Sequence, residues 1–277
     1  MRKKIIAANW KMHGTKREIN SLIENFVQEL SKEFKASNKN LDDATEIVLS
    51  APFVYLGLVK NKLEAMKEVD KENKNSFCNF AANIKLSSQN VHYEDKGAFT
   101  GEISPLMLKD IGCEYVIIGH SERRHVFQES NELISKKVKA AISHGITPIF
   151  CIGETKEDRD GGSADDVLKH QVYEALSRLD DCQKKADILL AYEPTWAIGE
   201  GGTPATPEYT DARHKTILET ADAILGRKVP CLYGGSVDQD NCEDLIRCPH
   251  VNGLFIGRAA WDLDSYLKIP SLCEAVI

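Results

Sequence analysis

Short runs of apolar, often β-branched residues recur along the chain at intervals that leave room for a helix between them. Most of these runs show little alternation of apolar and polar positions, which is typical of parallel strands buried on both faces. They predict eight strands, at residues 5–10, 46–51, 84–89, 115–119, 147–151, 188–193, 230–234 and 253–257. Between them, apolar residues repeat at helical spacing, as at Ile19, Leu22, Ile23, Phe26, Val27 and Leu30, and again over residues 134–142 before Gly145.

Eight strands alternating with helices predict an α/β fold, either a closed (β/α)8 barrel or a doubly wound sheet. The unusual polar residues favour the barrel over the doubly wound sheet, because they lie at the carboxyl ends of the predicted strands, where barrel enzymes have their active sites. These residues are Asn9, Lys11, His120, Glu193, Ser236 after Gly234-Gly235, and Gly257. No G-x-G-x-x-G motif follows the first strand, so the dinucleotide-binding alternative lacks its main signature. We predict one (β/α)8 barrel domain over residues 1–277.

Composition narrows the possible partners. The 277 residues include 35 Lys and Arg against 42 Asp and Glu, so the net charge of −7 argues against nucleic-acid binding. A helix needs about 20 apolar residues to span a bilayer, and no apolar run approaches that length, so no membrane partner is expected. The apolar stretch at residues 5–8 is also too short for the hydrophobic region of a signal peptide. The eight cysteines form no C-x-x-C pair or zinc-like cluster, which favours reduced thiols in a cytoplasmic protein without a metal. The polar stretch at residues 67–79 is expected to be a solvated helix end and loop.

Four motifs carry a family resemblance. The segments NWKM (9–12), GHSERR (119–124), YEPTWAIG (192–199) and YGGSV (233–237) resemble the signatures of triosephosphate isomerases, in the same order and across the whole chain. The resemblance implies a (β/α)8 barrel enzyme of glycolysis and gluconeogenesis. It would interconvert glycerone phosphate and glyceraldehyde 3-phosphate through an enediolate, without a cofactor.

Glu193 is the expected catalytic base. Pro194, the apolar residues 196–198 and the glycines after them predict a lid that closes over the site and excludes water. A carboxylate under such a lid loses hydration and becomes a stronger base towards a carbon acid. The resemblance implies that Glu193 abstracts the proton next to the substrate carbonyl.

His120 is the expected electrophile, because it precedes a predicted helix start, whose N–H groups disfavour a charged imidazole. The other seven histidines are interpreted as surface or packing residues. Lys11 would place a fixed cation near the enediolate or the phosphate. The resemblance implies that Asn9 orients the carbonyl and that Glu122 pairs with Lys11.

Backbone N–H groups can bind a phosphate without net positive charge where the chain approaches closely. Gly199, Ser236, Gly257 and the N–H of Arg258 are the candidates for this role. Residues 97–102 resemble the family's interdigitating loop, which implies a homodimer with Thr100 in a pocket of the neighbouring subunit. Phe99 in the same loop would face water without such a partner.

Two segments depart from typical family members. Residues 200–204 read EGGTP instead of TGKT, and Arg258 replaces the second of two glycines, so its side chain could reach the phosphate or Glu200. These departures resemble a branch that acts on phosphorylated tetruloses, the erythrulose-phosphate isomerases. The main interpretation is a three-carbon substrate, and two alternatives stay open: a four-carbon substrate, and a catalytically silent paralogue that binds a phosphorylated ligand or a protein. The joint presence of Asn9, Lys11, His120 and Glu193 argues against the silent paralogue.

Overall fold

Eight parallel strands close into a barrel in sequence order, with the last strand paired to the first. The computed structural model describes residues 4–37, 45–73, 83–199 and 202–275. The strands are β1 (Ile5–Asn9), β2 (Glu46–Ala51), β3 (Ile84–Ser88), β4 (Tyr115–Ile118), β5 (Thr147–Ile152), β6 (Leu189–Tyr192), β7 (Cys231–Tyr233) and β8 (Gly253–Ile256). Each boundary lies within one residue of the predicted one, and the predicted barrel is confirmed.

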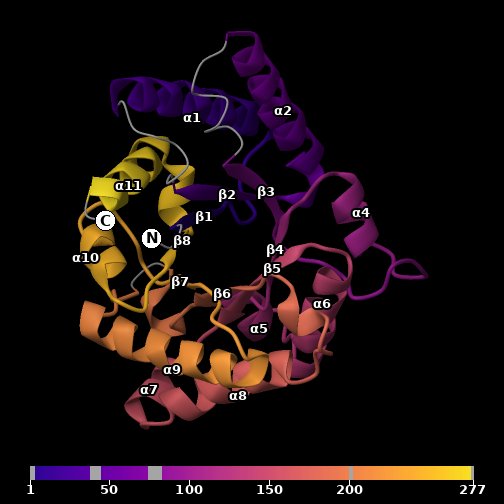
Figure 1. Cartoon of the computed structure of the whole chain (residues 1–277), viewed down its shortest axis with the longest axis vertical. Coiled ribbons are helices and arrows are strands. Elements are labelled where there is room, and N and C mark those ends of the chain that lie inside the picture. The colour runs from indigo at the N-terminus through magenta and orange to yellow at the C-terminus, as the bar shows by residue number, and fades with distance from the viewer. Residues whose placement is uncertain (1–3, 38–44, 74–82, 200–201, 276–277) are drawn as a thin grey trace.

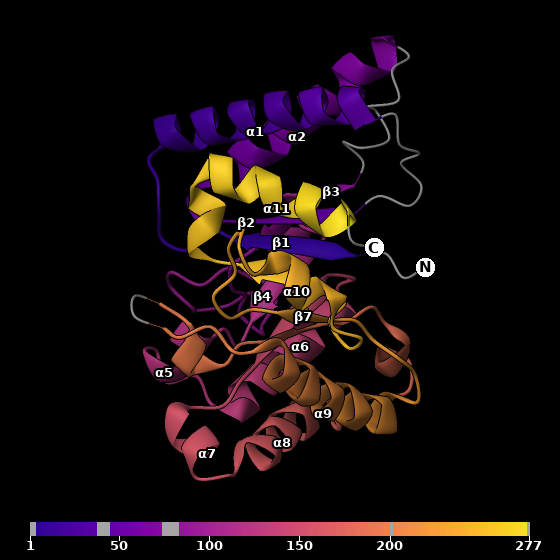
Figure 2. The same cartoon turned by 90° about the vertical axis from the view of Figure 1, so that its left-hand side faces the viewer.

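Helices surround the barrel (Figure 1). They are α1 (Lys16–Ser37), α2 (Leu56–Asn73), α4 (Pro105–Asp110), α5 (Ser121–His125), α6 (Asn131–Ser143), α7 (Lys156–Asp160), α8 (Ala164–Leu176), α9 (Pro207–Leu225), α10 (Cys242–Arg247) and α11 (Leu263–Ala275). Within the described ranges, the 3-10 turns η2 (Phe53–Tyr55), η3 (Gln183–Lys185), η4 (Thr195–Ala197) and η5 (Arg258–Trp261) lie in the connections between the main elements. The first and last long helices, α1 and α11, pack against each other, so the ring of helices closes where the barrel does (Figures 1 and 2).

The missing alternation in the strands has a direct structural reason, because both faces of each strand are buried. Ala7 points into the barrel interior and Ala8 into the layer between barrel and helices, and neither is exposed to solvent. Ile117 and Ile118 repeat this division in β4. A strand packed on both sides gains burial from every apolar residue, so a continuous apolar run is favoured over an alternating one.

The structure also bears on the predicted helices, on the polar stretch from residue 67, and on the question of membrane spans and metal sites. The helical pattern from Ile19 lies within α1, and the pattern over residues 134–142 lies within α6, which is followed by Gly145 at a φ of 64°. The predicted helix end at residues 67–79 agrees with α2 as far as Asn73, and residues 74–79 lie outside the described ranges. No helix in the described ranges is long and apolar enough to cross a membrane. In the same ranges no cluster of three metal-binding side chains occurs, and the seven cysteines are free thiols.

Candidate active site

The loops at the carboxyl ends of five strands enclose a cavity of about 940 Å³. The loops after β1, β4, β6, β7 and β8 contribute, so residues far apart in sequence meet at one mouth. All eight site residues predicted from the sequence line this cavity: Asn9, Lys11, His120, Glu193, Gly199, Ser236, Gly257 and Arg258.

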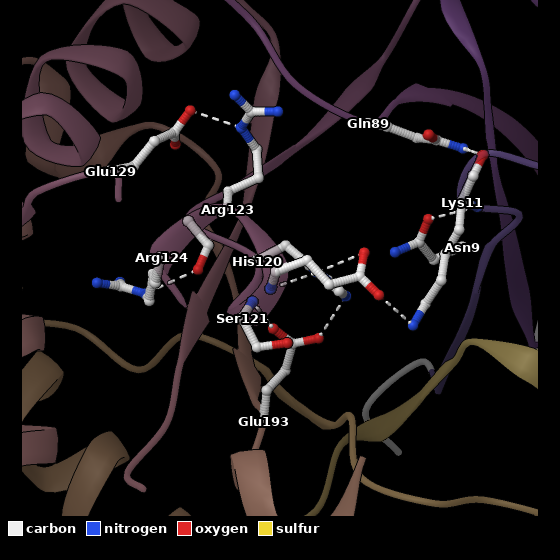
Figure 3. A network of polar contacts seen from close by, with 11 residues as sticks. Asn9, Lys11, Gln89, His120, Ser121, Arg123, Arg124, Glu129 and Glu193 are labelled. Carbon is white, nitrogen blue, oxygen red and sulfur yellow. Dashed lines mark hydrogen bonds and ion pairs between the residues drawn. The ribbon is translucent and has the colours of Figure 1, made fainter. Parts of the chain in front are cut away.

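His120 and Glu193 form a buried hydrogen-bonded pair at the floor of the cavity (Figure 3). His120 caps the N-terminus of α5, where its Nδ1 accepts a hydrogen bond from the N–H of Glu122 at 3.2 Å. An accepting Nδ1 carries no proton, so the Nε2 of a neutral imidazole donates to Glu193 Oε1 at 3.0 Å. The cap geometry thus selects the tautomer whose N–H points into the cavity.

Glu193 is 2% exposed, and its second oxygen accepts from the N–H of Ser121 at 2.9 Å. Burial raises the pKa of Glu193, but the contact with His120 and the Ser121 N–H lower it, and the net pKa lies below the ordinary value. The predicted desolvation of Glu193 is therefore present, but in this conformation its effect on the pKa is outweighed by the contacts with His120 and Ser121. Both carboxylate oxygens are engaged, so the side chain must exchange these bonds before it takes a proton from a substrate.

A glycine makes room for this carboxylate. A Cβ at Gly234 would lie 2.9 Å from Glu193 Cγ and 3.2 Å from the carbonyl oxygen of Tyr192. A larger residue at this position after β7 would displace the Glu193 side chain. The first glycine of the YGGSV motif is therefore needed for the position of the candidate base as well as for the loop.

Lys11 adopts a left-handed backbone conformation with a φ of 51°, which is rare for residues other than Gly, Asn and Asp. Its N–H donates to Asn9 Oδ1 at 3.0 Å, and its carbonyl accepts from Gln89 Nε2 at 2.8 Å. Gln89 also donates to the carbonyl of Ser50 at 3.1 Å. The turn directs the Lys11 ammonium to Glu122 Oε1 at 2.7 Å, the pairing that the family resemblance implied.

The glycine-rich end of the cavity holds contacts that the sequence did not predict. The N–H of Ser236, a candidate phosphate donor, donates to the carbonyl of Ala197 at 2.8 Å. The Arg258 guanidinium donates through Nη2 to the carbonyl of Gly199 at 3.0 Å. The loop after β6 is therefore bonded to the loops after β7 and β8, while Glu200, the other proposed partner of Arg258, lies outside the described ranges.

Sequence reasoning missed several lining residues. Phe255 places its ring edge-on to His120 at 6.2 Å, and its signal was present as an aromatic residue near the end of the last strand. His13, interpreted as a surface or packing residue, lines the cavity and packs against Trp261 with the two rings tilted and their centroids 5.7 Å apart, so that interpretation was incomplete. Gln89, also missed, does not line the cavity but supports the Lys11 turn; it was the last residue of a predicted strand, a polar position of the kind that identified Glu193.

The start of the loop after β6 has an anchor of its own. The fully buried Glu154 accepts hydrogen bonds from Tyr192 Oη at 2.9 Å, Trp196 Nε1 at 2.9 Å and Tyr209 Oη at 3.1 Å. Arg159 lies over the Trp196 ring at 4.2 Å. These contacts hold η4, and with it the chain between Glu193 and Gly199, against the barrel.

The segment at residues 97–102 is set apart from the cavity. Thr100 is exposed, does not line the cavity of its own chain, and lies between Gly97 and Gly101, whose φ values are 148° and 93°. Phe99 is 40% exposed and packs against His92, with the two rings tilted and their centroids 4.4 Å apart. The homodimer expected from this loop stays a prediction.

Comparison with known proteins agrees with the site. The family model for triosephosphate isomerase matches residues 4–273. An L-erythrulose-1-phosphate isomerase of Rhizobium rhizogenes is 45% identical over 270 residues, which cover 98% of this chain and 94% of that protein. An L-erythrulose-1-phosphate isomerase of Brucella abortus is 45% identical over 272 residues, which cover 98% of this chain and 97% of that protein. A triosephosphate isomerase of Roseiflexus sp. is 41% identical over 273 residues, which cover 97% of each chain. The chain belongs to the triosephosphate isomerase family, and it is an isomerase.

Proposed function

We propose that this enzyme isomerises a four-carbon phosphorylated ketose, L-erythrulose 1-phosphate, by proton transfer. The similarity that carries this choice is the 45% identity to L-erythrulose-1-phosphate isomerases over almost the whole chain. It replaces the three-carbon substrate that the motifs alone favoured. The departure at Arg258, at the mouth of the cavity, supports the same choice.

The chemistry follows from the groups at the cavity floor. In this ketose the carbonyl is at C2, C1 carries the phosphate, and C3 carries the acidic proton beside the carbonyl. Glu193 gives up its bonds to His120 and Ser121 and takes the C3 proton, and the C–H electron pair forms the C2–C3 double bond of an enediolate. Return of the proton to C2 leaves the carbonyl at C3. The product is again a phosphorylated ketose.

The developing negative charge determines the other roles. Nε2–H of neutral His120 donates to the carbonyl oxygen, and the Lys11 ammonium offsets the charge of the enediolate and the phosphate. Asn9 orients the carbonyl and also holds the Lys11 turn through its Oδ1. Backbone N–H groups of Gly199, Ser236, Gly257 and Arg258 hold the phosphate once the Ser236 N–H has left the Ala197 carbonyl.

We also propose that the chain acts as one barrel domain in a cytoplasmic homodimer. Thr100 would reach the partner's cavity, and the exposed Phe99 and the 95% exposed Met12 would be covered at the interface. Free thiols in the described ranges agree with a reducing compartment.

A second candidate is triosephosphate isomerase activity itself, favoured by the same four catalytic side chains and by the 41% identical relative. The two candidates are separated by measuring kcat/KM for L-erythrulose 1-phosphate and glycerone phosphate side by side. Proton NMR in D2O follows both reactions directly, since each turnover exchanges a carbon-bound proton. A higher kcat/KM for the four-carbon sugar supports the proposal and a higher value for the three-carbon sugar contradicts it. No exchange with either would favour the silent paralogue.

A further inference from the structure

Arg258 spans the mouth of the cavity from the last strand to the loop after β6. It follows Gly257 at the end of β8, and its side chain donates to the Gly199 carbonyl at 3.0 Å. That carbonyl also accepts the N–H of Gly202 at 3.3 Å. The guanidinium therefore contacts the point where the loop after β6 turns, at a φ of 85° for Gly199.

The bond to Gly199 uses one of the five N–H donors of a guanidinium. Within the described ranges Arg258 makes no ion pair with Asp238, which lines the same cavity. An arginine beside backbone N–H groups of Gly199 and Gly257 suits a phosphate dianion, because the planar fork can bind an anion and a carbonyl together. A lysine, with a compact ammonium, holds that bridging geometry less well.

We propose that Arg258 is a positioning residue that bridges the substrate phosphate to the Gly199 carbonyl. The side chain ties the bound dianion to the loop after β6, and its hold on that loop is strengthened when the phosphate is present. This inference rests on the proposed function for its substrate, although its first test needs only the anion.

The bridge also protects the reaction intermediate. An enediolate next to a phosphorylated carbon can expel inorganic phosphate: the C–O bond breaks, its electron pair leaves with the phosphate, and a new C–C double bond forms. The sugar is left as the enol of a dicarbonyl. Holding the phosphate against both loops disfavours this elimination, because the leaving anion would have to break its bonds to Arg258 and to the loop.

The first experiment measures binding of inorganic phosphate to the parent enzyme and to Arg258→Ala and Arg258→Lys by calorimetry. A charge-assisted contact of ~1.5–3 kcal/mol corresponds to about ten- to a hundredfold in affinity. We expect Arg258→Ala to lose about that factor, Arg258→Lys to lose less, and low concentrations of guanidinium ion to restore part of the affinity of Arg258→Ala. The control is Arg178→Ala, because this arginine pairs with Glu174 on α8 and does not line the cavity.

The second experiment measures kinetics on the preferred sugar phosphate. We expect Arg258→Ala to raise KM more than it lowers kcat, and to raise the ratio of inorganic phosphate released to sugar isomerised. Unchanged phosphate affinity in Arg258→Ala, or a loss that guanidinium does not rescue, would overturn the proposal, as would an unchanged elimination ratio. If the parent binds phosphate but isomerises neither sugar, the proposed function fails, while the phosphate affinities still decide the role of Arg258.

Discussion

His214 offers a quantitative test of how the barrel treats a buried titratable group. This residue of α9 is fully buried, edge-on to the Tyr192 ring at 5.5 Å and 6.4 Å from the Tyr233 ring. Burial lowers the pKa of His214 to about 3, against a small opposing effect from the His250 backbone and the Asp211 charge. The folded protein therefore keeps the imidazole neutral throughout the mildly acidic range.

The sign of the effect on stability follows from proton counting. An unfolded histidine titrates near 6.5 and binds a proton below that pH, whereas folded His214 does not bind one until about pH 3. Stability due to this residue is complete above the unfolded pKa and is lost as the pH falls below it, by ~1.4 kcal/mol per pH unit. Between pH 7 and pH 5 the loss amounts to about 2 kcal/mol.

The change His214→Phe removes this titration while keeping an aromatic ring in the site. We expect the free energy of unfolding, from urea titrations at pH 7 and pH 5, to fall by about 2 kcal/mol more in the parent than in His214→Phe. The exposed His170, changed to Phe as a control, should leave the parent's pH dependence intact. If His214→Phe loses as much stability as the parent between the two pH values, the neutral buried state assigned to His214 is refuted.

Three further outcomes test the site and the assembly. Shortening the base in Glu193→Asp withdraws the carboxylate by about one methylene, and since ~1 Å of misplacement can cost about a hundredfold, kcat should fall by that factor or more with little change in KM. A steady-state assay beside the exposed control Glu157→Asp checks this, and full activity of Glu193→Asp would show that another group is the base. Gln89→Ala should lower kcat and reduce the free energy of unfolding by ~1–3 kcal/mol, because the carbonyls of Lys11 and Ser50 lose their donor; an unchanged kcat would mean that the Lys11 turn holds without it. Sedimentation at micromolar concentration should find a dimer, and Thr100→Ala should lower kcat/KM, whereas a fully active monomer would contradict the interface.

The sequence by itself determined the architecture of this protein. Each strand is buried on both faces, so its apolar run could be recognised without any knowledge of its neighbours, and the helical spacing of α1 and α6 was equally local. The site residues were found for a related reason. Parallel strands bring their carboxyl ends to one face, so a polar residue at the end of a strand, such as Glu193 or His120, is placed at the mouth by topology alone.

The tertiary structure alone decided what each of these groups touches. The lowered pKa of Glu193 depends on His120, the N-cap of α5, and on the N–H of Ser121, its first residue, and burial by itself would have raised it. The Lys11 turn depends on Gln89, the residue after β3, and the reach of Arg258 to Gly199 depends on how two separate loops fold over the barrel. Such contacts are set by the shear of the closed barrel and by loop geometry, which place side chains to within an ångström, whereas sequence periodicity fixes only the face on which a residue lies.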